Sequence, residues 1–167
     1  YRKHLSVGSD AVYGNCYFIE FDGVYMNSTV YVNGQEVGHR PYGYSSFEYD
    51  ITEYLKKGDN VIAVKVDNSD QPNSRWYSGC GIYRHVWLTE THRIHVQHWG
   101  THVQTDAKTG QLTVDVELAP FKAMNSHRPT IRHTVFDANG KEVAKGTTEH
   151  AKLKVSKPML WSVEDPY

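Results

Sequence analysis

The chain has 167 residues, enough for one large domain or two small ones with a real hydrophobic core. Its 18 Lys and Arg nearly balance 19 Asp and Glu, and the formal net charge of −1 excludes the basic surface typical of nucleic-acid-binding proteins. No apolar run reaches the roughly 20 residues of a membrane-spanning helix, so no membrane partner is expected. The first residues also lack the charged start and apolar block of a signal peptide, and the cellular compartment stays open.

Short segments of alternating apolar and polar residues predict β-strands through the first half of the chain. These segments are residues 17–21, 29–32, 46–49, 61–66 and 82–88. Asn33 and Gly34 tolerate positive φ and stand between two such segments, which predicts a two-residue hairpin turn. Residues 50–55 predict a single helical turn with Asp50 as its N-cap and Glu53 in the capping-box position.

The character of the sequence changes after about Thr91, and we expect a domain boundary near residues 89–93. Strands are predicted at residues 94–99, 112–118, 131–136 and 151–155. Residues 137–140 predict a second hairpin turn. Short strands at this spacing favour an immunoglobulin-like sandwich. The expected division is therefore 1–90 for the first domain and 91–167 for the second.

The two cysteines, Cys16 and Cys80, do not have the spacing of a metal or redox motif. We interpret them as two unrelated buried thiols. The histidines at positions 92, 95 and 98 recur every third residue, which on a strand alternates faces instead of converging. No metal site built from protein side chains and no cofactor is therefore expected, although a surface Ca²⁺ or Na⁺ stays open.

Several different short motifs, each with a specific position relative to the others, are distributed along nearly the whole chain. They are the segments 21–24, 30–34, 43–44 and 58–60, Phe47, Asp50-Ile51, Arg75-Trp76, Gly81-Ile-Tyr-Arg84, Leu160-Trp-Ser162 and Asp165-Pro-Tyr167. In this order they resemble the first two domains of family 2 glycoside hydrolases, the relatives of β-galactosidase, β-glucuronidase and β-mannosidase. The sequence of residues 71–77, Gln-Pro-Asn-Ser-Arg-Trp-Tyr, looks most like that of β-galactosidase-type members.

This resemblance implies an all-β fold, with a jelly-roll (galactose-binding-like) β-sandwich followed by an immunoglobulin-like β-sandwich. It also implies that catalysis by the parent enzyme, a retaining glycosidase, resides in a TIM barrel that is absent here. We therefore expect a non-catalytic fragment in which both sandwiches are truncated. Its partners would be carbohydrate, through the parent enzyme, and the barrel of the same polypeptide. Exposed sheet edges would favour association into homo-oligomers.

The loop at residues 67–81 contains the candidate substrate-binding residues. Residues 73–84 combine arginines, aromatics and glycines, a composition suited to a carbohydrate-facing loop. Asn73 offers an amide donor and acceptor, Arg75 a planar donor fork and Trp76 a stacking face. In relatives the equivalent loop helps to shape the sugar subsite. The alternative is that Arg75 and Trp76 only fix the loop against the sandwich or another domain.

No catalytic residue is expected within the chain. A retaining glycosidase needs two carboxyl groups about 5–5.5 Å apart. Glu20 and Asp22 share a strand face by parity, but each fits a solvated or turn position better. Arg84 is expected to be a buried or interface ion-pair partner.

Two other functions stay open. An autonomous carbohydrate-binding module would present an exposed aromatic platform and bind sugar by itself. A structural or adhesive protein with two sandwiches would bind none.

Overall fold

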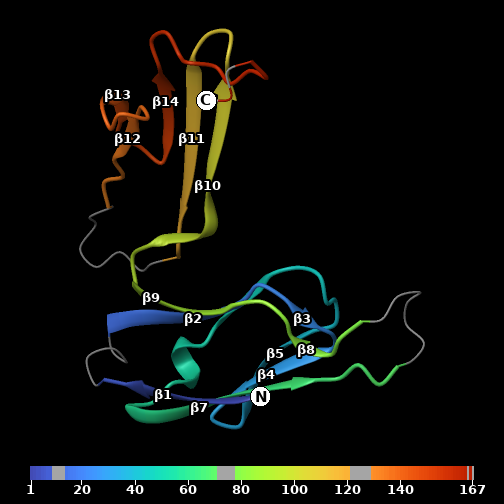
Figure 1. Ribbon diagram of the computed structural model, residues 1–167. Helices are drawn as coiled ribbons and strands as arrows, with labels where there is room; N and C mark the ends of the chain where they lie inside the picture. Colours follow the sequence, from blue (N-terminus) through green and yellow to red (C-terminus); the bar gives the residue numbers. More distant parts are fainter. Residues whose placement is uncertain (9–13, 71–77, 121–128, 165, 167) are drawn as a thin grey trace. The chain divides into compact units, whose positions relative to one another are not determined.

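The computed structural model describes residues 1–8, 14–70, 78–120, 129–164 and 166, and its regular structure is almost entirely β-strand (Figure 1). These residues form two compact units, Tyr1–Arg93 and Ile94–Tyr167. The prediction of an all-β fold is confirmed. Within the described ranges there is no helix with the length and apolar character needed to cross a membrane.

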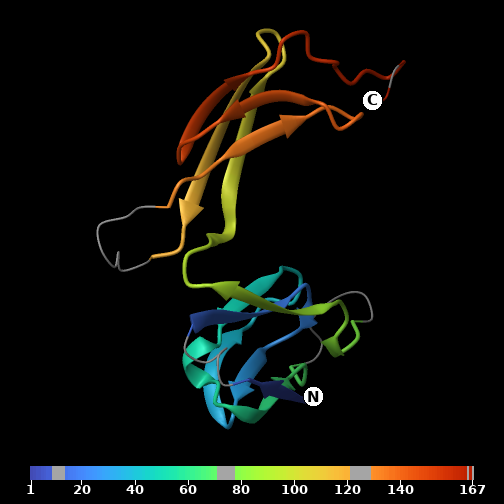
Figure 2. The same ribbon diagram turned by 90° about the vertical axis from the view of Figure 1, so that its left-hand side faces the viewer.

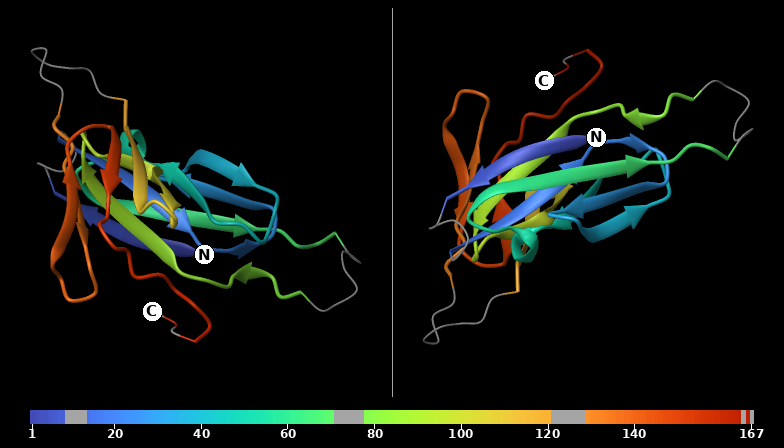
Figure 3. Two further views of the ribbon diagram at one scale, coloured as in Figure 1. Left: turned by 90° about the horizontal axis from the view of Figure 1, so that it is seen from above. Right: turned by 90° about the horizontal axis from the view of Figure 1, so that it is seen from below.

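The first unit contains two larger antiparallel sheets and one short ladder. One sheet has the order β1-β7-β4-β5 and the other the order β6-β2-β9, while β3 pairs with β8. The strands are β1 (Arg2–Val7), β2 (Asn15–Phe21), β3 (Val24–Tyr25), β4 (Ser28–Val32), β5 (Gln35–Arg40), β6 (Phe47–Asp50), β7 (Gly58–Val66), β8 (Gly81–Ile82) and β9 (Val86–His92). The view from below in Figure 3 shows the dark-blue β1 beside the green β7. The two larger sheets form the predicted sandwich.

The core of the first unit lies between these sheets. Ile19 and Phe21 alternate with more exposed residues along β2, and Val30 and Val32 do the same along β4. The Phe21 ring stacks on Phe47 of the neighbouring strand, with 5.1 Å between the ring centroids. Each large apolar side chain buried in this way contributes about 1.5–3 kcal/mol. The period-two pattern in the sequence therefore locates this core correctly.

The predicted hairpin turn at Asn33 and Gly34 joins β4 to β5, and both residues have positive φ, 52° and 84°. The Asn33 side chain also binds the neighbouring strand β7 of the same sheet and the 3₁₀ turn at residues 52–54. Its Nδ2 donates to the Tyr54 carbonyl at 2.9 Å, and its Oδ1 accepts from the Val61 amide at 3.1 Å. Asn33, a residue of the turn after β4, thus connects this turn with β7 and with the 3₁₀ turn that precedes β7.

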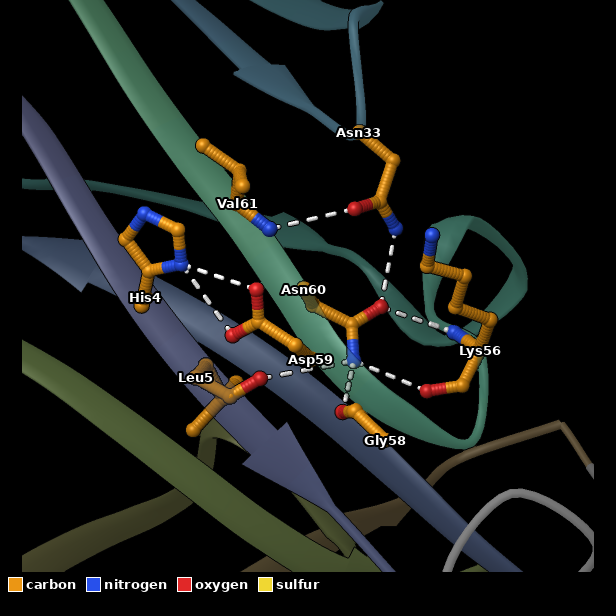
Figure 4. A network of polar contacts seen from close by, with 8 residues as sticks. All are labelled: His4, Leu5, Asn33, Lys56, Gly58, Asp59, Asn60 and Val61. Atoms are coloured by element: carbon orange, nitrogen blue, oxygen red, sulfur yellow. Dashed lines mark hydrogen bonds and ion pairs between the residues drawn. The ribbon is translucent and has the colours of Figure 1, made fainter.

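Asn60 is fully buried and its side chain forms the centre of a polar network (Figure 4). Its Oδ1 accepts from the Lys56 amide at 2.9 Å and from Asn33 Nδ2 at 2.8 Å. Its Nδ2 donates to the carbonyls of Lys56 and Gly58 at 2.8 and 2.9 Å. Because both ends of the amide are satisfied, burial of this polar group is tolerated and the turn before β7 is fixed.

Two local predictions need correction. Residues 52–54 form a 3₁₀ turn whose N-cap is Ile51, whereas Asp50 had been expected there. The Asp50 carboxylate accepts from the Thr52 amide at 2.9 Å and also from its hydroxyl, closing a local turn before the helix instead of capping it. The single strand predicted at residues 82–88 is divided into β8 and β9, because β8 pairs with β3 and β9 pairs with β2.

The second unit contains a sheet of order β10-β11-β14 and a hairpin, β12-β13 (Figure 2). The strands are β10 (Val96–Asp106), β11 (Gln111–Leu118), β12 (His133–Phe136), β13 (Glu142–Gly146) and β14 (His150–Lys154). The strand predicted at 94–99 runs on to Asp106, with a register shift between Val96 and Thr101 where Trp99 has φ 55°. The turn predicted at 137–140 is confirmed, because the Gly140 amide donates to the Asp137 carbonyl at 2.9 Å.

Both cysteines are free, as expected, but the prediction that they are buried is wrong. Cys16 is half-buried at the start of β2, and Cys80 is exposed just before β8. Neither is part of the core cluster.

Candidate carbohydrate-facing site

The three predicted substrate-binding residues, Asn73, Arg75 and Trp76, fall in the segment 71–77 and lie outside the described residues. The structure describes the chain on both sides of that segment. On the N-terminal side, the Asp67 carboxylate accepts from the Ser69 hydroxyl at 2.6 Å and from its amide at 3.1 Å. These two hydrogen bonds hold the pKa of Asp67 below its ordinary value. The turn leading into the loop is therefore fixed by a charged side chain.

On the C-terminal side, β8 is held by a short ladder. Tyr25 of β3 pairs with Gly81, and the Tyr1 hydroxyl accepts a hydrogen bond from the Ile82 amide at 3.2 Å. Gly81 has φ 129°, a conformation that favours glycine, and a Cβ there would collide with the Tyr1 hydroxyl. Glycine is thus required for the approach of the chain to Tyr1.

Several tyrosines gather beside β8. The rings of Tyr25 and Tyr44 lie 5.2 Å apart between centroids, tilted by 60°, and the Tyr42 ring meets Tyr44 edge-on at 5.7 Å. Tyr25 is buried, whereas Tyr44 is 61% exposed. Gly43 lies against the Tyr25 ring so closely that a Cβ would overlap it. A buried tyrosine thus supports an exposed one.

Tyr83 closes the opposite side of this cluster. Its hydroxyl donates to the Gly43 carbonyl at 2.8 Å, and its amide donates to the Gly23 carbonyl at 3.2 Å. A Cβ on Gly23 would lie 2.5 Å from the Tyr83 ring, so the ring rests directly on the backbone. The following residue, Arg84, is exposed and its guanidinium carbon lies 5.8 Å from the Tyr83 centroid. The prediction that Arg84 is a buried ion-pair partner is wrong, because Arg84 lies in the break between β8 and β9 and is exposed. The alternative, an ion-pair partner at an interface, stays a prediction.

These side chains surround a cavity of about 350 Å³, which we call the tyrosine pocket. It is lined by Tyr25, Tyr44, Ser78, Gly79, Cys80, Gly81, Ile82 and Tyr83. The motifs Gly43-Tyr44 and Gly81–Arg84 were visible in the sequence, but nothing in the sequence brought Tyr25, Tyr44 and Tyr83 together. The local signal was a glycine one or two residues before each of these tyrosines. Aromatic faces combined with hydroxyl groups suit a ligand with apolar faces and polar edges.

The expected absence of a catalytic carboxylate pair stays a prediction. Asp22 is engaged in the first unit, where its Oδ2 accepts from Trp87 Nε1 at 3.1 Å and lies 3.6 Å from His85 Nδ1. Two further described histidines each lie beside an acceptor, with His4 Nδ1 2.9 Å from the Asp59 carboxylate and His133 Nε2 2.7 Å from the Thr148 carbonyl. The absence of a cofactor and the open question of a surface Ca²⁺ or Na⁺ likewise stay as predicted from the sequence.

Two family models match consecutive parts of the chain. The model described as "Glycosyl hydrolases family 2, sugar binding domain" matches residues 1–92, and the model "Glycosyl hydrolases family 2" matches residues 93–167. The first of these alone covers more than half of the 167 residues.

Known proteins agree with these matches. The chain is 49% identical to the Beta-galactosidase BoGH2A of Bacteroides ovatus, an alignment that covers 100% of the chain and 21% of that enzyme. It is 31% identical to a Beta-glucuronidase of Formosa agariphila, covering 100% of the chain and 20% of that protein. A solved β-glycosidase from Bacteroides vulgatus superposes with a TM-score of 0.84 at 34% identity, over 99% of the chain and 22% of that structure. The chain thus spans about a fifth of the length of each.

Proposed function

Because the chain belongs to glycosyl hydrolase family 2, we propose that it forms the non-catalytic N-terminal region of a retaining glycosidase of the β-galactosidase type. Hydrolysis of the O-glycosyl bond would take place in a TIM barrel of the same polypeptide, outside residues 1–167. The observation that carries this proposal is the match of two consecutive family models, the first of them described as a sugar binding domain. The 49% identity to a β-galactosidase supports the substrate class.

Within this proposal, Asn73, Arg75 and Trp76 complete the sugar subsite of the barrel. Their chemistry supports the role, since an amide, a guanidinium fork and an indole face together bind hydroxyl groups and the apolar side of a pyranose ring. The segment that contains them starts after the Asp67 turn and ends at Ser78, which lines the tyrosine pocket. On the two described flanks, Asp67 is hydrogen-bonded to Ser69 and Gly81 pairs with Tyr25 of β3.

The test is substitution of these residues in the full-length polypeptide. Asn73→Ala and Arg75→Ala should each lower kcat/KM for an aryl β-galactoside by about 10- to 100-fold, because each removes hydrogen bonds made in the substrate complex. Arg132→Ala, which removes an exposed arginine of the second unit, is the matched control and should leave kcat/KM unchanged. If both loop variants behave like Arg132→Ala, the subsite role is wrong.

An autonomous carbohydrate-binding module is the second candidate, and the tyrosine pocket is the observation that favours it. Exposed aromatic rings are available in the isolated chain without any barrel. If the 167-residue chain binds sugar without hydrolysing it, the chain is an autonomous module. If it binds no sugar, it acts only together with the barrel.

Homo-oligomers through exposed sheet edges are also proposed. Among the described residues, β1 and β9 stand at the edges of their sheets, and a cavity of about 390 Å³ lies between them. Val86 and Leu88 lie on the same face of the sheet as the buried Phe21 and Ile19, with which they pair, yet they are 42% and 44% exposed. Such open edges template pairing with another chain.

Light scattering coupled to size exclusion checks this association. The 167-residue chain should form dimers at high concentration, and Leu88→Lys should shift it to the monomer by placing a charge at the edge. Val163→Lys, at a position 79% exposed outside the strands, serves as control. A clean monomer at every concentration would count against the proposal.

A further inference from the structure

We propose that Asn139 is a site of spontaneous deamidation in this chain, whereas Asn33, which is also followed by glycine, is protected by the fold. The dipeptide Asn-Gly occurs twice in the sequence, at 33–34 and 139–140, and each copy lies in the turn of a β-hairpin. Glycine has no Cβ to shield the peptide nitrogen after asparagine or to restrict its movement. The two copies therefore have a similar intrinsic reactivity and differ in their surroundings. This inference is independent of the proposed function.

The reaction is an attack within the chain that consumes water and releases ammonia. A base from the solvent takes the proton of the Gly140 amide, and the nitrogen then forms a bond to Asn139 Cγ. The bond between Cγ and Nδ2 breaks, the leaving nitrogen takes a proton and departs as ammonia, and a cyclic imide remains. Water opens this ring on either side of its nitrogen. The products are aspartate and isoaspartate, and in isoaspartate the main chain runs through the side-chain carbonyl carbon.

The Asn33 side chain is restrained against this reaction by hydrogen bonds at both ends of its amide. Its Nδ2 donates to the Tyr54 carbonyl at 2.9 Å and to Asn60 Oδ1 at 2.8 Å, and its Oδ1 accepts from the Val61 amide at 3.1 Å. The Asn33 backbone amide also donates to the Val61 carbonyl at 2.8 Å. The side chain can turn towards the Gly34 nitrogen only when its bonds break together. Such an opening disrupts the network around the fully buried Asn60 and is costly in free energy.

Asn139 has a different environment, because it is exposed in the turn between β12 and β13. Its backbone amide donates to the Asp137 carboxylate at 2.9 Å, and the Gly140 amide donates to the Asp137 carbonyl at 2.9 Å. The second of these bonds has to open before the Gly140 nitrogen can react. In the described part of the chain β12 pairs with β13 as a two-stranded sheet, and its apolar residues Val135 and Ala144 are only partly buried. Local opening therefore costs less free energy here than around Asn60.

Deamidation of Asn139 is expected to loosen this hairpin. The Asp137 carboxylate accepts from both the Asn139 and the Lys141 amides at 2.9 Å, so the new carboxylate would form next to an existing one. Repulsion between the two charges weakens these bonds. Isoaspartate has a further effect, because it inserts a methylene group into the turn that the Asp137 amide closes by donating to the Lys141 carbonyl. The modification thus acts on a hairpin that packs against the core of the second unit.

The experiment follows deamidation of the 167-residue chain by peptide mass spectrometry during incubation at mildly alkaline pH, in native buffer and in urea. In native buffer the peptide with Asn139 should convert at least about tenfold faster than the peptide with Asn33, because of the difference in opening free energy. In urea the two peptides should convert at similar rates, since the unfolded chain presents both sites equally. Asn139→Gln should remove the signal at residue 139 and leave Asn33 unchanged, because glutamine would have to form a larger ring.

Hydrogen exchange on the incubated chain measures the structural consequence. Peptides from β12 and β13 should lose protection as the converted fraction grows, whereas peptides from β4 and β7 should keep it. Asn139→Asp supplies the negative charge without the extra methylene group, so it should show a smaller loss than the isoaspartate form.

Two results would overturn the inference. One is conversion of Asn33 in native buffer as fast as Asn139, and the other is conversion of Asn139 in urea alone. Unchanged protection of β12 and β13 in the converted chain would refute the effect on the hairpin. None of these measurements involves sugar binding or hydrolysis, so their outcome is separate from the kinetic test of Asn73 and Arg75.

Discussion

The first unit buries hydrophobic side chains from both of its larger sheets, whereas the buried hydrophobic side chains described in the second unit come from one sheet. In the first unit, Phe21 and Phe47 meet Val30 and Val64 across the interior. In the described part of the second unit, the buried hydrophobic residues are Val114 and Val116 of β11 and Ala151 and Leu153 of β14, and their partners Val135 and Ala144 on the hairpin are only partly buried. The same alternation of apolar and polar residues in the two units therefore leads to cores that are buried to different degrees.

The largest effect is expected when one buried side chain in each core is replaced by alanine. Phe21→Ala should destabilise the first unit by about 3–5 kcal/mol, because the ring is 1% exposed and its removal leaves a cavity. Leu153→Ala should cost about 2 kcal/mol in the second unit, the low end of the range for such changes, since partly buried neighbours can close around it.

Hydrogen exchange resolved by peptide measures the two effects separately. Peptides from β2 should lose protection in Phe21→Ala, and those from β11 in Leu153→Ala. Equal losses in free energy would show that the second core is as tightly closed as the first, contrary to the comparison.

A smaller effect concerns one exposed aspartate in each unit. The Thr109 hydroxyl and the Lys108 amide hold the pKa of Asp106 below its ordinary value of 3.8, and Ser69 does the same for Asp67. Since the folded-state pKa is lowered, the stabilisation is present above the ordinary pKa and is lost as pH falls through the folded-state value. Asp106→Asn and Asp67→Asn should therefore each be less stable than the parent chain at neutral pH.

Thermal unfolding at several pH values checks this expectation. The difference from the parent chain should shrink as the pH is lowered below 3.8. Asp70→Asn removes the charge of another exposed aspartate and controls for a general effect of net charge. A destabilisation that does not change with pH would show that the charge of the carboxylate is not the cause.

Local signals predicted much of the fold. The strands around Phe21, Val32 and Val64 and the turn at Asn33-Gly34 were all readable, because strand alternation and positive φ depend on neighbouring residues. The division of residues 82–88 into β8 and β9 was not readable, because it depends on which partner strand each half meets. The prediction of Asp50 as N-cap of the turn at 52–54 was wrong for a local reason: Ile51 is the N-cap, and Asp50, one residue before it, accepts from the Thr52 amide through its carboxylate.

The candidate site divides in the same way. Its family was predicted by the sequence alone, through motif spacing, and is confirmed. Asn73, Arg75 and Trp76 were proposed as its binding residues from their residue types, and their role stays a prediction. The tyrosine pocket was decided only by the tertiary structure, which brings Tyr25, Tyr44 and Tyr83 to one place through the β3–β8 ladder and the contact of Tyr83 with Gly43. Asn60 illustrates the same limit, because its hydrogen-bond partners Asn33 and Leu5 are distant from it in the sequence. Sequence specifies local conformation through neighbouring residues, but a pocket or a buried network exists only once distant strands have packed.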